Sequence, residues 1–188
     1  ETYSRMLDNI RDSLKDMEFT EKSINSLLEI REAKLSFVPS STDSSQLCDI
    51  SLFDHMKITA AIASAVYDYA KEQQTADYKN TFYSKGNASY EEKAFLLCSM
   101  DISGIQNFIY TIAAAKALKN LRARSFYLEL MMEHIVDQLL NELESTRANL
   151  LYTGGGHAYL LLPNTENCKT AITEFRNKLN QWFMDNFG

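Results

Sequence analysis

The sequence is poor in features that would mark a specialised class of protein. Its three cysteines, Cys48, Cys98 and Cys168, are odd in number, widely spaced and without a CxxC pair, which argues against a disulfide framework and a zinc site. No apolar run comes near the ~18 residues of a membrane-spanning helix. We therefore predict a soluble protein of the reducing cytoplasm, without a membrane partner.

Basic residues are also fewer than acidic residues. Nineteen Lys and Arg residues face 25 Asp and Glu residues, which gives a net charge of -6. No global basic field is available to attract nucleic acid, so any RNA or DNA contact is expected to be local. The chain begins at Glu1 without a basic segment followed by an apolar one, so we expect a segment of a longer protein rather than a secretory precursor. Hydrophobic residues at 45% and charged residues at 23% are ordinary for a globular protein.

The first half of the chain is predicted to be helical. Apolar residues at helical spacing predict helices over residues 3–17 and 24–35, a loop over 37–49, and a third helix that begins near Ser51. A polar stretch over residues 71–92 has no sustained apolar stripe and is interpreted as a linker. The predicted domains are thus 1–70, which is helical, and 93–188, joined by 71–92.

One histidine lies in the first turn of the third predicted helix. His55 shares a helix face with Ile58, Ile62 and Val66, so its ring is expected to point where the apolar residues point. This position suggests a metal ligand, but a lone histidine of this kind is more often a core or capping residue. Because the chain has no His-Asp dyad, it cannot complete a metal site of this kind alone.

The second half begins with a predicted strand over residues 95–100, mostly apolar and expected to be buried on both faces, which ends at Asp101. A helix follows from Ile105, so residues 101–104 form a strand-to-helix turn with Asp101 or Ser103 as the N-cap. Backbone N–H groups at such a turn can hold an anion, and Gly104 allows close approach. An ordinary turn between a strand and a helix has the same pattern.

A basic segment lies between the helical pattern that begins at Ile105 and a further helix predicted from Ser125 to about Leu143. It has two interpretations, which remain open at this point: a solvated helix end, where cations favour the dipole, or a contact to the phosphates of a nucleotide or an RNA strand. Its members are Lys116, Lys119, Arg122 and Arg124.

Half of the six glycines are consecutive, at Gly154, Gly155 and Gly156, between predicted strands over 149–153 and 157–162. Three glycines exceed the needs of a tight turn, which suggests that something approaches the backbone closely. A helical stripe then runs from Cys168 to the end of the chain. The order βαββα predicts an α+β domain one strand short of the ferredoxin-like unit, with an unpaired edge on the first strand.

Five ordered blocks carry a resemblance to a known family. They are Met100–Tyr110, Leu121–Leu128, Tyr152–Thr165 with its glycines, Phe37–Thr42 and Asp49–Lys57. The first three resemble the first palm domain of the large subunit of type III-A CRISPR effector (Csm) complexes. The other two resemble the end of the permuted HD nuclease domain of that subunit. The resemblance implies a helical remnant of an HD domain followed by a ferredoxin-like palm domain that lacks its last strand.

The family resemblance implies two activities for the whole subunit. The HD domain cuts single-stranded DNA with divalent metal ions, and two palm domains convert ATP into cyclic oligoadenylates when target RNA is bound. His55 matches a histidine of the HD metal site, which is incomplete in this chain. The hairpin reads Gly154-Gly155-Gly156-His157 and lacks the carboxylates that Mg²⁺ or Mn²⁺ requires. The resemblance therefore implies that the second palm, absent here, holds these metals, and this chain alone is not expected to be active.

The resemblance also implies a nucleotide site. The turn at Ser103, Gly104 and Ile105 would contact phosphate, Ser125 would read the adenine edge, the nucleotide would lie on residues 154–156, and Asn107 is a weaker candidate. The implied partners are the second palm, other Csm subunits, CRISPR RNA and target RNA, with single-stranded DNA at the HD domain. The alternative hypothesis is a degenerate palm that serves only as a scaffold for the active palm and the RNA-binding subunits.

Overall fold

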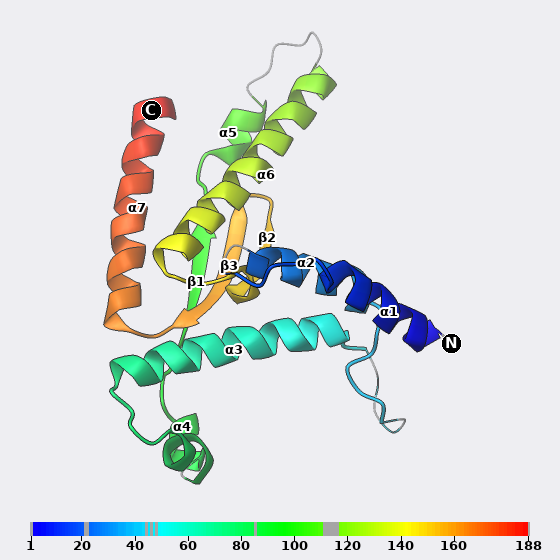
Figure 1. Cartoon of the computed structure of the whole chain (residues 1–188). Coiled ribbons are helices and arrows are strands. Elements are labelled where there is room, and N and C mark those ends of the chain that lie inside the picture. Colours follow the sequence, from blue (N-terminus) through cyan, green and yellow to red (C-terminus); the bar gives the residue numbers. More distant parts are fainter. Residues whose placement is uncertain are drawn as a thin grey trace. The chain divides into compact units, whose positions relative to one another are not determined.

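The computed structural model describes residues 2–20, 23–43, 45, 47, 49–84, 86–110 and 117–187. They form two compact units, of which the first contains residues up to Ile62 together with Thr146–Asn149, and the second contains Ala63–Ser145 and Leu150 onward (Figure 1). The domain limits predicted above, 1–70, 71–92 and 93–188, stay a prediction. None of the described helices is long and apolar enough to cross a membrane.

The first unit contains the predicted helices. Helix α1 spans Thr2–Leu14 and contacts α2, which spans Ile24–Leu35. The predicted loop follows, and an antiparallel bridge between Pro39 and Ser51 closes it just before α3, Leu52–Glu72. These three predicted helices and the loop are confirmed.

An N-cap serine fixes the start of α3. The Ser51 hydroxyl accepts a hydrogen bond from the backbone N–H of Asp54 at 3.0 Å and donates one to the Asp54 carboxylate at 2.7 Å. The first bond satisfies one of the backbone donors that a helix start otherwise leaves open, and the second joins the two side chains. This N-cap places His55 in the first turn, as predicted.

The face assigned to His55 is wrong. His55 is exposed, and its supposed core partners Ile58 and Ile62 are 40% and 42% exposed. The buried side chains of this part of α3 are Phe53, at 5% exposure, and Ala61, which is fully buried. The larger aliphatic residues misled the prediction, because a small alanine can bring a helix backbone close to its neighbour and so mark the packed face.

The second unit holds a three-stranded antiparallel sheet. Its strands are β1 (Phe95–Asp101), β2 (Leu150–Gly154) and β3 (His157–Pro163), in the order β1-β3-β2. Helices α6, Ala117–Glu142, and α7, Glu166–Phe187, pack with the sheet (Figure 1). The α+β class, the hairpin and the unpaired edge of β1 are confirmed.

Strand β1 has only one covered face, so the prediction that it is buried on both faces is wrong. Leu96, Cys98 and Met100 pack against the core, which contains Val136 of α6 and Leu160 of β3. The alternate positions are open, with Phe95 43% and Leu97 64% exposed. Side chains alternate along a strand, so an apolar run alone cannot distinguish one covered face from two.

Helix α6 begins earlier than predicted. It runs from Ala117 rather than from about Ser125, so Lys119, Arg122 and Arg124 lie within one helix and not between two helical patterns. The apolar stripe becomes regular only in the later turns, which is why the spacing missed the polar start. Lys116 lies outside the described residues, and the preceding helix α5 spans Ile105–Tyr110.

The stretch predicted as a linker contains helical elements. After α3 ends at Glu72, a short π-helix spans Asn80–Ser84 and α4 spans Gly86–Tyr90. The Tyr69 hydroxyl on α3 donates a hydrogen bond to the Glu92 carboxylate at 2.9 Å. This contact joins the two ends of the stretch.

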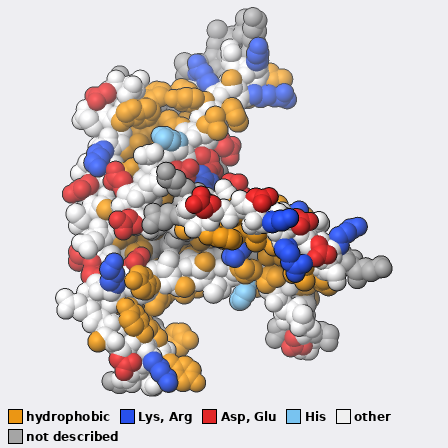
Figure 2. All heavy atoms as spheres, in the orientation of Figure 1, with side chains coloured by type: hydrophobic (Ala, Val, Ile, Leu, Met, Phe, Trp, Pro, Cys, Tyr) orange, Lys and Arg blue, Asp and Glu red, His pale blue; other side chains and the backbone are white. Residues whose placement is uncertain are grey.

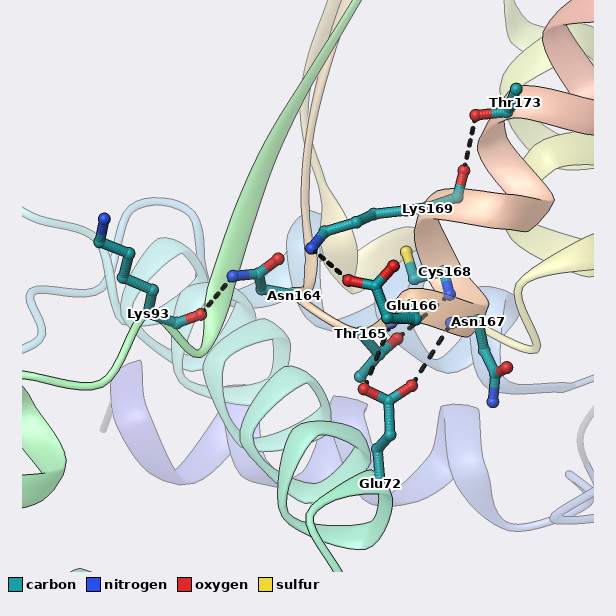
Figure 3. Close-up of polar contacts among 9 residues, drawn as sticks. All are labelled: Glu72, Lys93, Asn164, Thr165, Glu166, Asn167, Cys168, Lys169 and Thr173. Atoms are coloured by element: carbon teal, nitrogen blue, oxygen red, sulfur yellow. Dashed lines mark hydrogen bonds and ion pairs between the residues drawn. The ribbon is translucent and has the colours of Figure 1, made fainter.

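Side chains cap the N-terminus of helix α7 (Figure 3). The Glu72 carboxylate at the end of α3 accepts hydrogen bonds from the backbone N–H groups of Glu166 and Asn167 at 3.2 and 3.3 Å. Thr165 acts as the N-cap, because its hydroxyl accepts a hydrogen bond from the N–H of Cys168 at 3.1 Å. Three first-turn donors of α7 are thereby satisfied within the chain.

Candidate functional site

The turn after β1 and the turn of the glycine hairpin meet at one end of the sheet. The backbone N–H of Ile102 donates a hydrogen bond to the carbonyl of Gly156 at 3.1 Å. A Cβ atom built on Gly156 would lie only 1.9 Å from the Cδ1 atom of Ile105, so the Ile105 side chain packs directly against this glycine. Two predicted groups of nucleotide-binding residues, Ser103–Ile105 and Gly154–Gly156, are thus brought together.

The glycines have local structural reasons. Gly104, Gly155 and Gly156 have φ values of +81°, +60° and +84°, a region that side chains disfavour. A Cβ atom on Gly154 would lie 2.7 Å from the Tyr152 hydroxyl oxygen. The backbone conformation therefore accounts for Gly155 and Gly156 without a ligand, whereas Gly154 has no positive φ and would meet only the side chain of the exposed Tyr152.

An ion pair joins the hairpin to the end of β1. Asp101 and His157 are register partners on adjacent strands, and the Asp101 Oδ1 atom lies 3.1 Å from the His157 Nε2 atom. The other ring nitrogen, Nδ1, lies 3.3 Å from the carbonyl oxygen of Gly155. Both side chains are about half exposed, at 58% and 51%. The ring therefore bridges the strand end and the glycine turn.

A cavity of about 780 Å³ opens beside this turn, between the end of β1 and helices α5, α6 and α7. Ser103, Gly104, Ile105 and Asn107 are among its lining residues. Most of the remaining wall is apolar, and Figure 2 shows hydrophobic side chains at the surface around the C-terminal end of α7 and the neighbouring α5. Four of the eight predicted nucleotide-binding residues therefore share one cavity.

The other predicted residues lie outside that cavity wall. Gly154, Gly155 and Gly156 sit at the hairpin turn, and Ser125 is an exposed residue of α6 next to Arg124, which does line the cavity. The geometry thus brings the glycine turn close to the turn at Ser103–Ile105, but Ser125 lies at the edge of the cavity.

Arg124 makes contacts within the site. Its guanidinium donates a hydrogen bond to the backbone carbonyl of Phe108 and lies 5.2 Å from the centre of the Phe108 ring. The Phe108 ring also meets Tyr127 and Phe187, with centroids 6.1 Å away in each case. A cation over an aromatic face stabilises the packing of α5 on α6, so Arg124 has a structural role, whatever the roles of Lys119 and Arg122.

The described residues do not form a metal centre by themselves. No group of three or more His, Cys, Asp or Glu side chains among them is placed to hold a metal ion. His55 is exposed, and the neighbouring Asp54 carboxylate accepts the hydrogen bond from Ser51. A metal site that includes His55 would need ligands from outside the described residues.

One thiol, that of Cys98, lines the cavity, and a second, that of Cys168, is buried outside its wall. Cys98 and Cys168 are free cysteines, consistent with the prediction of no disulfide framework, and Cys48 lies outside the described residues. Burial, with a smaller contribution from the nearby Cys98, raises the pKa of the Cys168 thiol to about 11. Burial also raises the pKa of Cys98. Both thiols are therefore poor nucleophiles.

Sequence reasoning missed three contacts at this site: Asp101 with His157, Ile105 with Gly156, and Arg124 with Phe108. The first depends on the register of β1 on β3, which the hairpin spacing does not fix, because the hairpin aligns only β2 with β3. The other two depend on the positions of side chains in three dimensions and leave no spacing signal.

Comparison with known proteins agrees with these features. A family model described as Csm1 subunit domain B matches residues 94–188. The chain is 48% identical over 185 residues to the CRISPR system single-strand-specific deoxyribonuclease Cas10/Csm1 (subtype III-A) of Mycobacterium tuberculosis, a match that covers 98% of this chain and 23% of that protein. It is 49% identical over 189 residues to the same kind of protein from Enterococcus italicus, covering 98% and 25%. The chain therefore spans about a quarter of the length of these curated relatives.

Solved structures have the same fold. A Csm1–Csm4 cassette in complex with pppApA superimposes with a TM-score of 0.81 at 34% sequence identity, covering 98% of this chain and 24% of that one. A Csm1–Csm4 cassette in complex with cA4 gives a TM-score of 0.78 at 34% identity, covering 98% and 23%.

Proposed function

The chain belongs to the Csm1 family of large subunits of type III-A CRISPR systems, and from this membership we propose that its second unit is the ATP-binding first palm of a cyclic oligoadenylate synthetase. In this proposal the palm has the ferredoxin-like fold without its last strand, and it belongs to a subunit that makes cyclic oligoadenylates when target RNA binds. The first unit is the end of an HD domain that cuts single-stranded DNA.

One observation carries the proposal. The turn at Ser103–Ile105 and the hairpin turn at Gly154–Gly156 meet at one end of the sheet, through the hydrogen bond from Ile102 to Gly156 and the packing of Ile105. Ser103, Gly104 and Gly155 are exposed at these turns, whereas Gly156 is buried against Ile105, and exposed backbone N–H groups at such turns are suited to phosphate oxygens.

The cavity beside the turns supports a bound nucleoside. Its wall combines the polar residues Ser103 and Asn107 with the aromatic ring of Phe108, a mixture that suits a base with a polar edge and a flat apolar face. We propose that the triphosphate lies at the turns and that the adenosine extends along α5 toward Ser125, in the first half of α6. Ser125 then donates to or accepts from the adenine edge.

The chain's own residues bind and orient ATP but do not carry out phosphoryl transfer. The hairpin offers Gly154–Gly156 and His157 where Mg²⁺ or Mn²⁺ would need carboxylates. The ion, held mainly by a second palm, would neutralise charge on the phosphates. The first palm contributes by fixing the geometry of the reacting groups at the interface between the two palms.

His55 is proposed as one ligand of the divalent metal of the HD site. Its exposed position at the first turn of α3 leaves the ring accessible to ligands from another segment. The remaining partners of the proposal are Csm4, which accompanies Csm1 in the solved cassettes, the other Csm subunits, CRISPR RNA and target RNA.

A scaffold remains the second candidate function, because one observation favours it. The φ values of Gly155 and Gly156 and the packing of Ile105 on Gly156 explain these two glycines without any nucleotide. In this alternative the palm is degenerate and only docks the active palm and the RNA-binding subunits.

Calorimetric titration of ATP with Mg²⁺ distinguishes the two functions. The chain is titrated alone and after mixing with an active second palm from a Csm1 relative. We expect saturable binding that appears or strengthens with the second palm and that is lost in Ser125→Ala, whereas Ser103→Ala keeps the backbone N–H groups of the turn and is expected to retain binding. Ser26→Ala on α2 is the matched control, since Ser26 is exposed and lies in the first unit.

The contrary result is equally clear. If neither sample binds ATP while circular dichroism shows both proteins folded, the scaffold is favoured. The same conclusion follows if Ser125→Ala changes neither binding nor oligoadenylate formation.

A further inference from the structure

A histidine next to the glycine turn contacts two segments at once. His157 is the first residue of β3, and its Nε2 atom lies 3.1 Å from the Asp101 carboxylate at the end of β1. Its Nδ1 atom lies 3.3 Å from the carbonyl oxygen of Gly155. One imidazole therefore spans the distance between the turn of the hairpin and the last residue before the phosphate turn.

The two partners of the ring are both acceptors. A carboxylate oxygen and a carbonyl oxygen can only accept hydrogen bonds, so each contact forms when the facing ring nitrogen carries a hydrogen. The bond to the Asp101 carboxylate is charge-assisted and therefore stronger than a neutral one, although exposure to solvent limits the gain.

The turn needs a tether of this kind. Gly155 and Gly156 have φ values of +60° and +84°, and glycine loses more conformational freedom on ordering than any other residue. The hydrogen bond from Ile102 holds the Gly156 carbonyl. The ring holds the carbonyl of Gly155, so the two consecutive glycines are fixed from different sides.

We propose that His157 is a positioning residue, which ties the glycine turn to the end of β1 and so keeps the turn in the conformation that receives the phosphates of ATP. This inference rests on the proposed function for its ligand. The same contact engages the Asp101 carboxylate, whose negative charge would otherwise face a triphosphate at the adjoining turn. His157 thus acts through Gly155 and Asp101, and not by contact with the reacting atoms.

Three variants test the proposal. His157→Ala removes both contacts, and His157→Gln keeps one amide donor that can reach Asp101. His134→Ala is the matched control, because His134 is an exposed histidine of α6 that does not line the cavity. Hydrogen exchange of the backbone amides at 155–157 is measured without nucleotide, and ATP affinity is measured by calorimetry with Mg²⁺ and the second palm.

We expect His157→Ala to speed exchange at the turn and to weaken ATP binding, each about fivefold, the size expected for one net hydrogen bond. His157→Gln is expected to recover part of both effects, and His134→Ala neither. A double variant, Asp101→Asn with His157→Ala, is expected to bind ATP more tightly than His157→Ala alone, because the uncompensated charge is gone, while exchange at the turn stays fast.

Unchanged exchange in His157→Ala would overturn the tether. Faster exchange with unchanged ATP affinity would overturn the positioning role. If the unmodified chain with the second palm binds no ATP, the proposed function fails and the nucleotide role of His157 with it, whereas the exchange measurement still decides whether the ring holds the turn. The two failures are therefore distinguishable.

Discussion

Replacement of Gly156 by alanine is predicted to destabilise the sheet unit by a definite amount. The new Cβ atom would lie 1.9 Å from Ile105 Cδ1 and 3.4 Å from Ile105 Cγ1, on a backbone with φ +84°. A side chain in the left-handed region costs about 1–2 kcal/mol, and displacement of Ile105 from its rotamer adds about 1 kcal/mol. The sum of about 2–3 kcal/mol corresponds to a fall in Tm of about 5–10 °C for a chain of this size.

Two other glycines separate the contributions. Gly155→Ala meets nothing within 4 Å at φ +60°, so it should lose only the backbone part, about 1 kcal/mol. Gly86→Ala meets nothing within 4 Å and has no positive φ, so its stability should be unchanged or slightly raised. Urea unfolding followed by circular dichroism gives the free energy of unfolding for each variant.

A double-mutant cycle with Ile105→Val tests the steric contact itself. In the unmodified chain this change should cost about 0.5–1.5 kcal/mol. In the Gly156→Ala background it should cost about 1 kcal/mol less, because the colliding Cδ1 atom is removed. Equal stability of Gly156→Ala and Gly86→Ala, or no coupling in the cycle, would refute the packing of Ile105 against the hairpin.

Three further predictions concern titratable groups of the second unit. Glu72→Gln removes the charge at the start of α7 and should lower the free energy of unfolding by about 0.5–1 kcal/mol at neutral pH. The control Glu129→Gln, on the exposed side of α6, should not lower it. Urea titrations measure the free energy of unfolding of both variants, and equal losses would contradict the capping role of Glu72. Burial raises the pKa of Asp68, so the folded state holds this proton more tightly than the unfolded state, and ionisation costs stability as pH rises through the folded pKa. Asp68→Asn should therefore raise Tm at neutral pH and lose that advantage in acid, as followed by thermal melts; a lower Tm at neutral pH would contradict this. Iodoacetamide at neutral pH should label Cys168 far more slowly than Cys98 in the folded chain, because burial raises the pKa of Cys168 to about 11 and Cys98 is less buried. Mass spectrometry of the labelled peptides measures the two rates. Equal rates would contradict the prediction.

Periodicity predicted the elements better than their faces. The helices at Thr2–Leu14 and Ile24–Leu35 were predicted within a few residues, because spacing along one chain is a local property. The face of α3 was wrong because Ala61 packs while Ile62 stays exposed, and burial depends on what lies opposite. The open face of β1 was missed for the same reason.

The sequence predicted the individual turns of the candidate site but not the contacts between them. Backbone needs at Gly104 and at the hairpin leave a trace in the sequence, since glycine is the residue that tolerates positive φ. The contacts of Ile105 with Gly156 and of His157 with Asp101 join segments more than fifty residues apart, and they follow from the order β1-β3-β2. Strand order is a property of the whole sheet, and no local pattern encodes it.

The closed start of α7 has a consequence for ligand selectivity. A helix of this length normally offers its first N–H groups as an anion site, but here the Glu72 carboxylate already accepts from Glu166 and Asn167. An incoming triphosphate would have to displace a tethered anion of the same sign, which acts as a built-in competitor. Phosphate binding at the start of α7 is thereby disfavoured, in keeping with the proposal that the triphosphate binds at the turn of Ser103 and Gly104.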